Sequence, residues 1–109
     1  MEEKIFNKLV RDKIPEIIEG NGEVAVTRIL DEDEYKLELE KKLLEECNEV
    51  LSTISHDERI EELADVLEVL SSLGTLEGEE LDSIISVMKN KRETRGGFSQ
   101  KIFLEKTMK

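Results

Sequence analysis

Two groups of acidic residues are the part of this sequence best suited to chemistry. Glu45, Glu46 and Glu49 form the first group, and Glu62 and Asp65 form the second. Residues three apart lie on the same side of a helix, so Glu46 pairs with Glu49 and Glu62 pairs with Asp65. Carboxylate oxygens are the ligands that Mg²⁺ prefers. Two helices that face each other would therefore make a Mg²⁺ site from Glu46, Glu49, Glu62 and Asp65, which Mn²⁺ could also occupy.

Helical periodicity on both sides of the polar break at 52–57 indicates a helix hairpin. Such a short connection favours an antiparallel pair. In a projection at about 100° per residue, Glu62 falls inside the apolar arc of the second helix, between Val66 and Val69, and Asp65 borders that arc. Desolvating a carboxylate costs several kcal/mol unless something compensates its charge, and a bound cation would do so.

A simpler interpretation applies to the other acidic residues. The chain is 39% charged, so glutamates at helical spacing usually form a solvated face. A solvated face accounts for Glu45 or Glu49 taken alone. It accounts poorly for Glu62, because a surface glutamate should not interrupt an apolar stripe. The alternative function is therefore a non-catalytic helical dimer, a binding or regulatory module in which the acidic residues only keep the bundle soluble.

The remaining local signals predict one mainly all-α domain over 1–109, an antiparallel helical bundle centred on the hairpin. Pro15 suits the first turn of a short helix that ends at the Gly20-Asn21-Gly22 turn. Asp31-x-x-Glu34 is typical of a helix N-terminus, and Ser55 or Asp57 would cap the next helix. We expect long helices at about 32–53 and 79–93, and between them a helix that follows the cap and runs to about Leu73. Alternating apolar residues predict two short strands that form a small two-stranded β element, at 23–30 and 98–104.

The composition limits the classes of partner. A net charge of −11 argues against binding to nucleic acid or to anionic membranes. The chain carries no apolar run of membrane-spanning length and no signal peptide, so we expect a cytoplasmic protein. The single cysteine, Cys47, excludes an intrachain disulfide and lies on the apolar arc, where we expect it to pack in the core. Because 109 residues make only a small core, we expect a homodimer or a dimer of dimers.

The basic residues gather near the two ends of the chain. Lys89, Arg92 and Arg95 share one side of the last expected helix, a row that suits a polyphosphate. Cations near a helix C-terminus also complement the helix dipole, and physics alone leaves both roles open. Lys8, Arg11 and Lys13 would approach the same ligand only if the fold brings the amino terminus to the hairpin.

The pattern EExxE followed by ExxD resembles the signature of the MazG-like all-α nucleoside triphosphate pyrophosphohydrolase superfamily. That superfamily includes MazG, the phosphoribosyl-ATP pyrophosphohydrolases and the dimeric all-α dUTPases. The opening run from Asn7 to Pro15, NKLVRDKIP, and the late run from Arg95 to Phe98, RGGF, resemble a small stand-alone branch labelled phosphoribosyl-ATP pyrophosphohydrolase-like. Together these matches cover most of the chain.

The resemblance implies Mg²⁺-dependent hydrolysis of a nucleotide between its α- and β-phosphates. A nucleoside triphosphate and phosphoribosyl-ATP both remain open as the substrate, and the sequence does not name the base. In this interpretation Glu46, Glu49, Glu62 and Asp65 bind metal, and Glu45 or Glu49 orders or deprotonates the attacking water. The resemblance also favours phosphate contact for Lys89, Arg92 and Arg95, with Lys8, Arg11 and Lys13 as further candidates.

Overall fold

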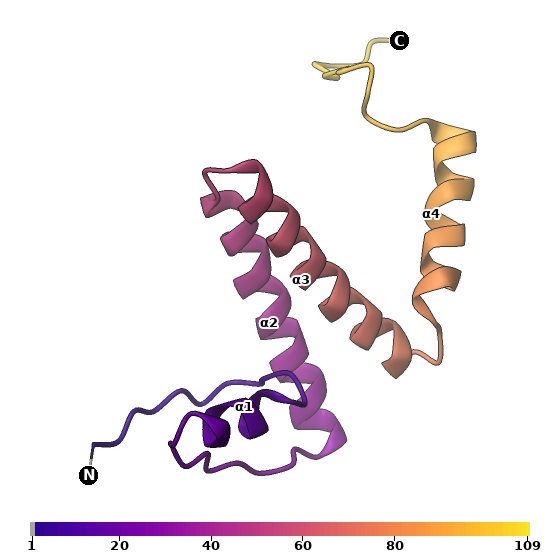
Figure 1. Ribbon diagram of the computed structural model, residues 1–109. Coiled ribbons are helices and arrows are strands. Elements are labelled where there is room, and N and C mark those ends of the chain that lie inside the picture. Colours follow the sequence, from indigo (N-terminus) through magenta and orange to yellow (C-terminus); the bar gives the residue numbers. More distant parts are fainter. Residues whose placement is uncertain (1) are drawn as a thin grey trace.

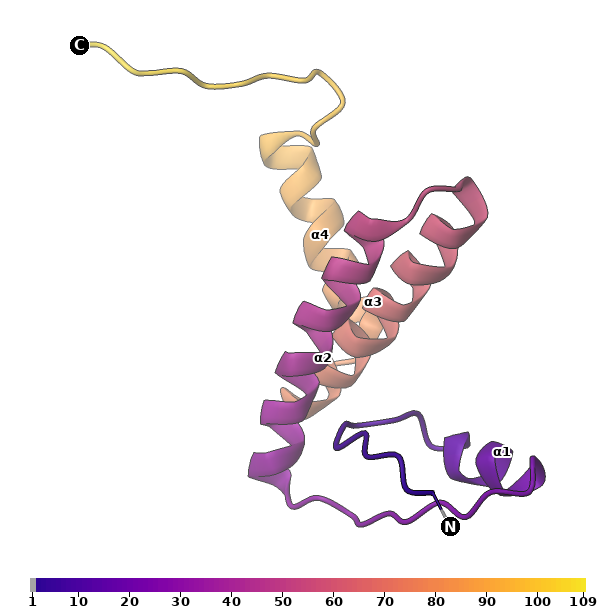
Figure 2. The ribbon, with the colours of Figure 1, turned by 90° about the vertical axis from the view of Figure 1, so that its left-hand side faces the viewer.

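The computed structural model describes residues 2–109 and contains four helices (Figures 1 and 2). In chain order they are α1 (Ile14–Gly20), α2 (Glu32–Ser52), α3 (His56–Leu76) and α4 (Leu81–Arg95). Helices α2 and α3 form the predicted hairpin, and the prediction of an all-α fold is confirmed. No helix in this part of the chain is both long enough and apolar enough to cross a bilayer.

The helix starts follow the predicted capping chemistry. The Asp31 carboxylate accepts a hydrogen bond from the Glu34 backbone N–H at 2.9 Å, which satisfies one of the donors left free at the start of α2. The Ser55 hydroxyl accepts one from the Glu58 N–H at 3.2 Å, so Ser55 rather than Asp57 caps α3. Pro15 occupies the first turn of α1, where its missing N–H costs nothing.

The hairpin is closed by the three residues Thr53, Ile54 and Ser55. The Thr53 hydroxyl donates to the Val50 carbonyl at 2.7 Å and accepts from the Arg59 Nε at 3.2 Å, which ties the turn to both helices. Leu39 and Val69 lie at matching distances from this turn and are the buried hydrophobic residues within 2–109, with 4% and 7% of their surface exposed. They mark the centre of a narrow α2–α3 seam.

A tight corner joins α3 to α4. Gly74 is buried, and a Cβ atom there would lie 2.6 Å from the end of the Ile84 side chain and 3.3 Å from the Glu79 carbonyl oxygen. Gly78 makes the turn with a positive φ of 77°, a conformation that favours glycine. From this corner α4 leans away from α2 (Figure 1), and among the helices it makes its contacts with α3.

Enlarging the side chain at this corner should open it. We expect Gly74→Leu to lower the free energy of unfolding by about 1–3 kcal/mol, because the added atoms displace Ile84 and press on the Glu79 carbonyl. Gly74→Ala is the matched control, since the better helix propensity of alanine, about 1 kcal/mol, offsets the small shift of a flexible side-chain end. Urea unfolding measures both. Equal effects of the two substitutions would contradict this view of the corner.

The predicted β element is wrong. Residues 23–30 and 98–104 form neither helix nor strand, and most of their apolar side chains are exposed to solvent, Val26 by 94%. The physical reason is the separation of the two segments, which lie at opposite ends of the molecule in both views (Figures 1 and 2). A β-strand requires a neighbouring strand for its backbone hydrogen bonds, and local alternation of apolar residues does not supply one.

Cys47 also departs from expectation. It is exposed in the single chain, so the prediction that it packs in the core is wrong for this structure. The apolar arc of α2 is wider than the seam that α3 covers, and residues at its edge remain in solvent, as Leu51 does with 77% of its surface exposed.

Candidate metal centre

The hairpin brings three of the four predicted metal ligands together. Glu46 projects from α2, and Glu62 and Asp65 project from α3, two turns further from the connection than the cap at Ser55. One carboxylate oxygen from each lies within 4.8 Å of the other two, and all three side chains are half-buried. Three acidic groups that share one seam carry a strong mutual repulsion, and the same oxygens could hold one divalent cation.

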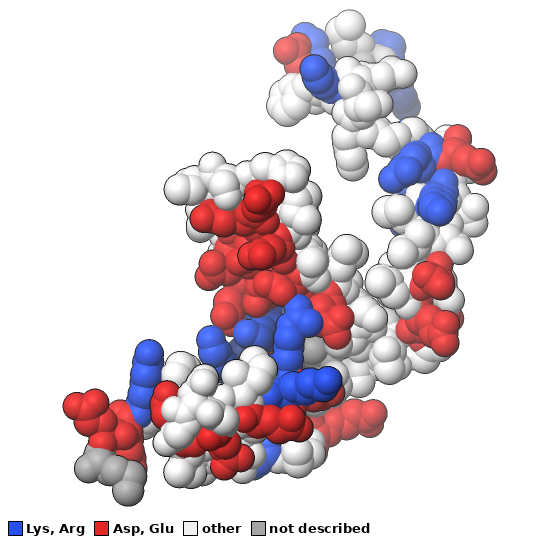
Figure 3. Space-filling model, in the orientation of Figure 1, with Lys and Arg blue, Asp and Glu red and all other residues white. Residues whose placement is uncertain are grey.

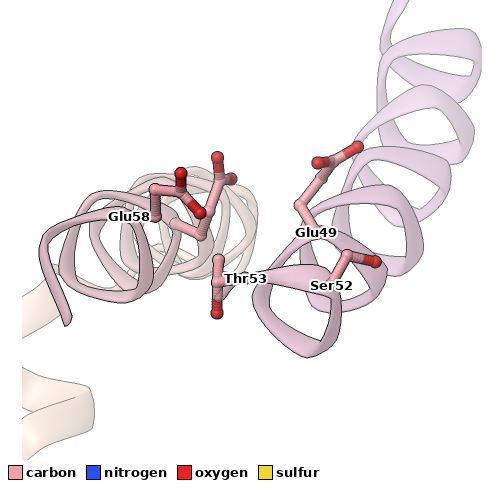
Figure 4. A pocket seen from close by; sticks show the side chains of 5 residues that line it. Glu49, Ser52, Thr53 and Glu58 are labelled. Carbon is pink, nitrogen blue, oxygen red and sulfur yellow. The ribbon is translucent and has the colours of Figure 1, made fainter. Parts of the chain in front are cut away.

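Glu49, the fourth predicted ligand, lies outside this trio. It is exposed and lines a shallow, open depression next to Glu62, together with Ser52, Thr53 and Glu58. Figure 4 shows that Glu49 and Ser52 come from α2 and Glu58 from the opposing helix, with Thr53 between them. Glu46 and Glu49 therefore lie near Glu62 on neighbouring turns of α2, and the depression leaves Glu49 open to a ligand from solvent.

Glu62 is the residue at which negative charge is most crowded. Partial desolvation in the seam raises the pKa of its carboxyl, and the charges of Asp65, Glu46 and Glu49 raise that pKa further. A hydrogen-bonding interaction with Glu46 acts in the same direction. This agrees with the sequence projection, which placed Glu62 inside the apolar arc and set it apart from the solvated acids.

The raised pKa makes stability depend on pH in a defined direction. The folded chain holds the Glu62 proton more tightly than the unfolded chain, so in metal-free buffer stability falls as pH rises from the ordinary glutamate range near 4.5 through the raised folded pKa. We expect Glu62→Gln, measured with a chelator present, to raise the melting temperature at about pH 7 and to leave it unchanged near pH 4. Thermal melts at the two pH values check this.

Glu61→Gln is the control for that experiment. Glu61 is the adjacent residue on α3, is exposed, and loses the same formal charge. An equal rise in melting temperature for both variants would show that the gain comes from lower net charge and not from the crowded position of Glu62.

Basic residues from the amino-terminal segment reach the acidic cluster. Arg11 Nη2 donates to Asp65 Oδ1 at 2.7 Å, and Lys8 Nζ lies 3.9 Å from a Glu45 carboxylate oxygen. Residues 7–9 and α2 also line a second open depression, which includes Glu45. The fold therefore does bring Lys8 and Arg11 to the hairpin. Lys13 makes no ion pair over residues 2–109.

Lys42 is a neighbour of the cluster that the sequence analysis did not identify. Its Nζ lies 3.5 Å from Glu45 and 3.8 Å from Glu46, and its side chain is mostly buried. The signal was present in the spacing, because a lysine three and four residues before two glutamates faces both on one side of a helix. Lys42 and Lys8 together hold Glu45, which lies one turn before Glu49 on α2 and lines the second depression instead of the one that Glu49 lines.

The other predicted phosphate ligands lie elsewhere. Lys89, Arg92 and Arg95 belong to α4 and form no ion pair in the described part of the chain. Figure 3 shows the basic side chains of α4 separated from the acidic hairpin by open space. Within one chain, the structure brings the amino-terminal cations to the acidic cluster and leaves the carboxy-terminal cations apart from it.

Comparison with known proteins gives little further guidance. No family model matches the chain, and no solved structure matches it. A stretch of 54 residues is 43% identical to part of an uncharacterized protein of Mycolicibacterium smegmatis. The match covers 50% of this chain and 55% of that relative, so the chain spans about half the length of the curated relative it matches.

Proposed function

We propose that this protein is a metal-dependent nucleoside triphosphate pyrophosphohydrolase of the MazG-like superfamily. The observation that carries the proposal is the meeting of Glu46, Glu62 and Asp65, whose carboxylate oxygens approach within 4.8 Å from two helices. The raised pKa of Glu62 supports it, since crowding of carboxylates in a seam is the arrangement that a cation relieves. The acidic pattern that suggested the family supplies all three residues.

The donor set suits a hard cation. The trio offers only carboxylate oxygens, the ligands of Mg²⁺ and Mn²⁺, and it contains neither the histidine nor the cysteine that zinc sites favour. When bound, Mg²⁺ would neutralise charge on the triphosphate and acidify a water molecule. Glu46, Glu62 and Asp65 would hold it, and Glu49, three residues after Glu46 on α2, would be the candidate for a further ligand.

The water that attacks the α-phosphorus needs a base. Its oxygen forms a bond to the α-phosphorus while the bond between that phosphorus and the bridging oxygen to the β-phosphate breaks, and pyrophosphate leaves. The proton of the water passes to a carboxylate, either Glu49 or Glu45. Glu49 is the better placed, because it lines the same depression as Glu62, whereas Lys8 and Lys42 engage Glu45 in ion pairs.

Arg11 connects the cation site to the phosphates in this proposal. Its guanidinium neutralises Asp65 in the metal-free chain and would turn to a phosphate oxygen when metal and nucleotide bind. We expect Arg11→Met to tighten Mn²⁺ binding about two- to fivefold in the absence of nucleotide, because an exposed ion pair contributes up to about 1 kcal/mol. The same substitution should raise the KM for nucleotide. Calorimetric Mn²⁺ titration and steady-state kinetics measure the two effects.

Arg28→Met is the matched control for that variant. Arg28 forms a somewhat more exposed ion pair with Glu34 at 2.9 Å, at the far end of α2 from the cluster. The control should change neither Mn²⁺ affinity nor KM. A loss of Mn²⁺ affinity in Arg11→Met would contradict the assigned competition between the guanidinium and the cation.

Pyrophosphate release tests the function itself. A panel of ordinary, deoxy and damaged nucleoside triphosphates, together with phosphoribosyl-ATP, should yield release from at least one member with Mg²⁺ and none with a chelator. Turnover of phosphoribosyl-ATP alone would identify a dedicated phosphoribosyl-ATP enzyme. Absence of release across the panel, combined with no effect of Mg²⁺ on the melting temperature, would overturn the proposal.

One observation favours a second candidate, the non-catalytic helical dimer. Arg11 forms an ion pair with Asp65 and Lys42 lies 3.8 Å from Glu46, so these acidic residues have basic partners within the chain. A ligand that binds only the folded state raises its melting temperature. No rise at millimolar Mg²⁺ and no pyrophosphate release would together support this candidate over the enzyme.

A further inference from the structure

The carboxy-terminal part of the chain has few contacts with the rest. Helix α4 touches only α3 among the helices of residues 2–109, and the segment after Arg95 contains no helix or strand. Phe98 is 99% exposed, and Ile102, Phe103, Leu104 and Met108 are nearly as open. Both ribbon views show this segment extending away from the hairpin (Figures 1 and 2). An apolar segment in water gains free energy when another surface covers it.

The hairpin also lacks a surface that covers its outer apolar residues. Its outer apolar residues remain exposed beside the narrow seam, among them Leu44, Leu51, Ile54, Leu63 and Leu67. The whole chain exposes 10350 Å², whereas a folded monomer of 12.5 kDa is expected to expose about 6,200 Å². The excess of about 4,000 Å² per chain is several times the roughly 800 Å² that each partner contributes to a standard protein interface. A large partner surface is therefore missing from the single chain.

Charge indicates what that surface is. Residues 89–109 contain seven basic residues and two acidic ones in a chain whose net charge is −11. The hairpin, residues 32–76, contains fourteen acidic residues and four basic ones. In Figure 3 red side chains dominate the part of the hairpin nearest its connection, and blue side chains gather near the end of α4 and on the terminal segment beside fewer red ones. Each region carries the charge and the apolar surface that would suit the other.

We infer that the basic arm, residues 89–109, packs on the acidic hairpin of a second copy of this chain. In a two-fold dimer the exchange is mutual, so each hairpin receives one arm. Residues 96–109 in extended form reach about 45 Å, which exceeds the roughly 32 Å length of α2, so the arm is long enough to follow the hairpin. Gly96, with a φ of 83°, permits a change of direction where the arm leaves α4.

The exchange would also complete the site. Arg92 and Arg95 of the second copy would stand opposite the Glu46, Glu62 and Asp65 cluster and hold the phosphates of a nucleotide from that side. This part rests on the proposed function, whereas the packing of the arm on a second copy does not. The two parts therefore need separate experiments.

Cross-linking tests the packing without reference to activity. Equal amounts of ¹⁵N-labelled and unlabelled protein are unfolded together, refolded, and treated with a carbodiimide that joins lysines to carboxylates in direct contact. We expect links between lysines of 89–109 and carboxylates of the hairpin, about half of them joining a labelled to an unlabelled peptide, which is the statistical share for random pairing. Links within one isotope only, no such links, or a monomeric mass in solution would overturn the inference.

Mixing two inactive variants tests the shared site. Asp65→Asn removes the acidic half, and the Arg92→Ala, Arg95→Ala double substitution removes the basic half. Co-refolded one to one, they should regain about a quarter of wild-type activity, because half of the dimers are mixed and each mixed dimer has one intact site. If the mixture regains no activity although mixed cross-links form and the wild type is active, the shared site is refuted and the packing of the arm is not. An inactive wild type with mixed cross-links would instead refute the proposed function and leave the packing intact. Circular dichroism confirms that each variant folds.

Discussion

Glu49→Gln should lower Mg²⁺-dependent pyrophosphate release about 100- to 10,000-fold, the usual contribution of a general base. The substitution keeps the size of the side chain and removes its ability to take a proton or to bind the cation as an anion. Since Glu49 is exposed on α2, the helical circular dichroism of the variant should match that of the wild type. Pyrophosphate release under saturating nucleotide and Mg²⁺ measures the effect.

Two further variants, Glu45→Gln and Glu61→Gln, are the controls for this experiment. Glu45 is held by Lys8 and Lys42, so its substitution should reduce activity far less than that of Glu49, and exposed Glu61 should be neutral. A larger loss for Glu45→Gln would move the role of base to that residue. Near-full activity of Glu49→Gln would remove Glu49 from both the metal site and the reaction.

The second large effect concerns the seam that positions the cluster. Leu39→Ala should lower the free energy of unfolding by about 2–5 kcal/mol, because Leu39 is buried in the seam with Val69 and its truncation leaves a cavity between α2 and α3. Leu37→Ala, two residues away and 59% exposed, should change it by no more than about 0.5 kcal/mol. Urea unfolding at fixed protein concentration compares them, and equal losses would contradict the placement of the seam.

The local chemistry of the sequence predicted most of the helical framework. Asp31 and Ser55 carry side chains that can accept from the first free N–H groups of a helix, and both do so. The position of Glu62 was predictable for a similar reason, because helical periodicity alone placed it on the apolar arc. These features depend on residues within a few positions of one another, where a single sequence is informative.

Features that depend on distant segments were not predictable in the same way. The alternating residues at 23–30 and 98–104 suggested strands, yet pairing requires the two segments to meet, and the helices between them hold them apart. The ion pair between Arg11 and Asp65 joins residues 54 positions apart and follows from the path of the amino-terminal segment. Likewise, the width of the apolar arc does not reveal which part the partner helix covers, and Cys47 falls on the uncovered part.

The central claim is that Glu62 and Asp65 hold a divalent cation. Mn²⁺ titration followed by electron paramagnetic resonance, which observes the free ion, tests it most directly. We expect the Glu62→Gln, Asp65→Asn variant to bind Mn²⁺ at least about tenfold more weakly than wild type, a difference of about 1.4 kcal/mol. The Glu61→Gln, Glu68→Gln variant loses the same charge from exposed positions of α3 and should bind as wild type does. Equal affinities for all three proteins would contradict the claim and would indicate that the acidic cluster is part of an ordinary solvated surface.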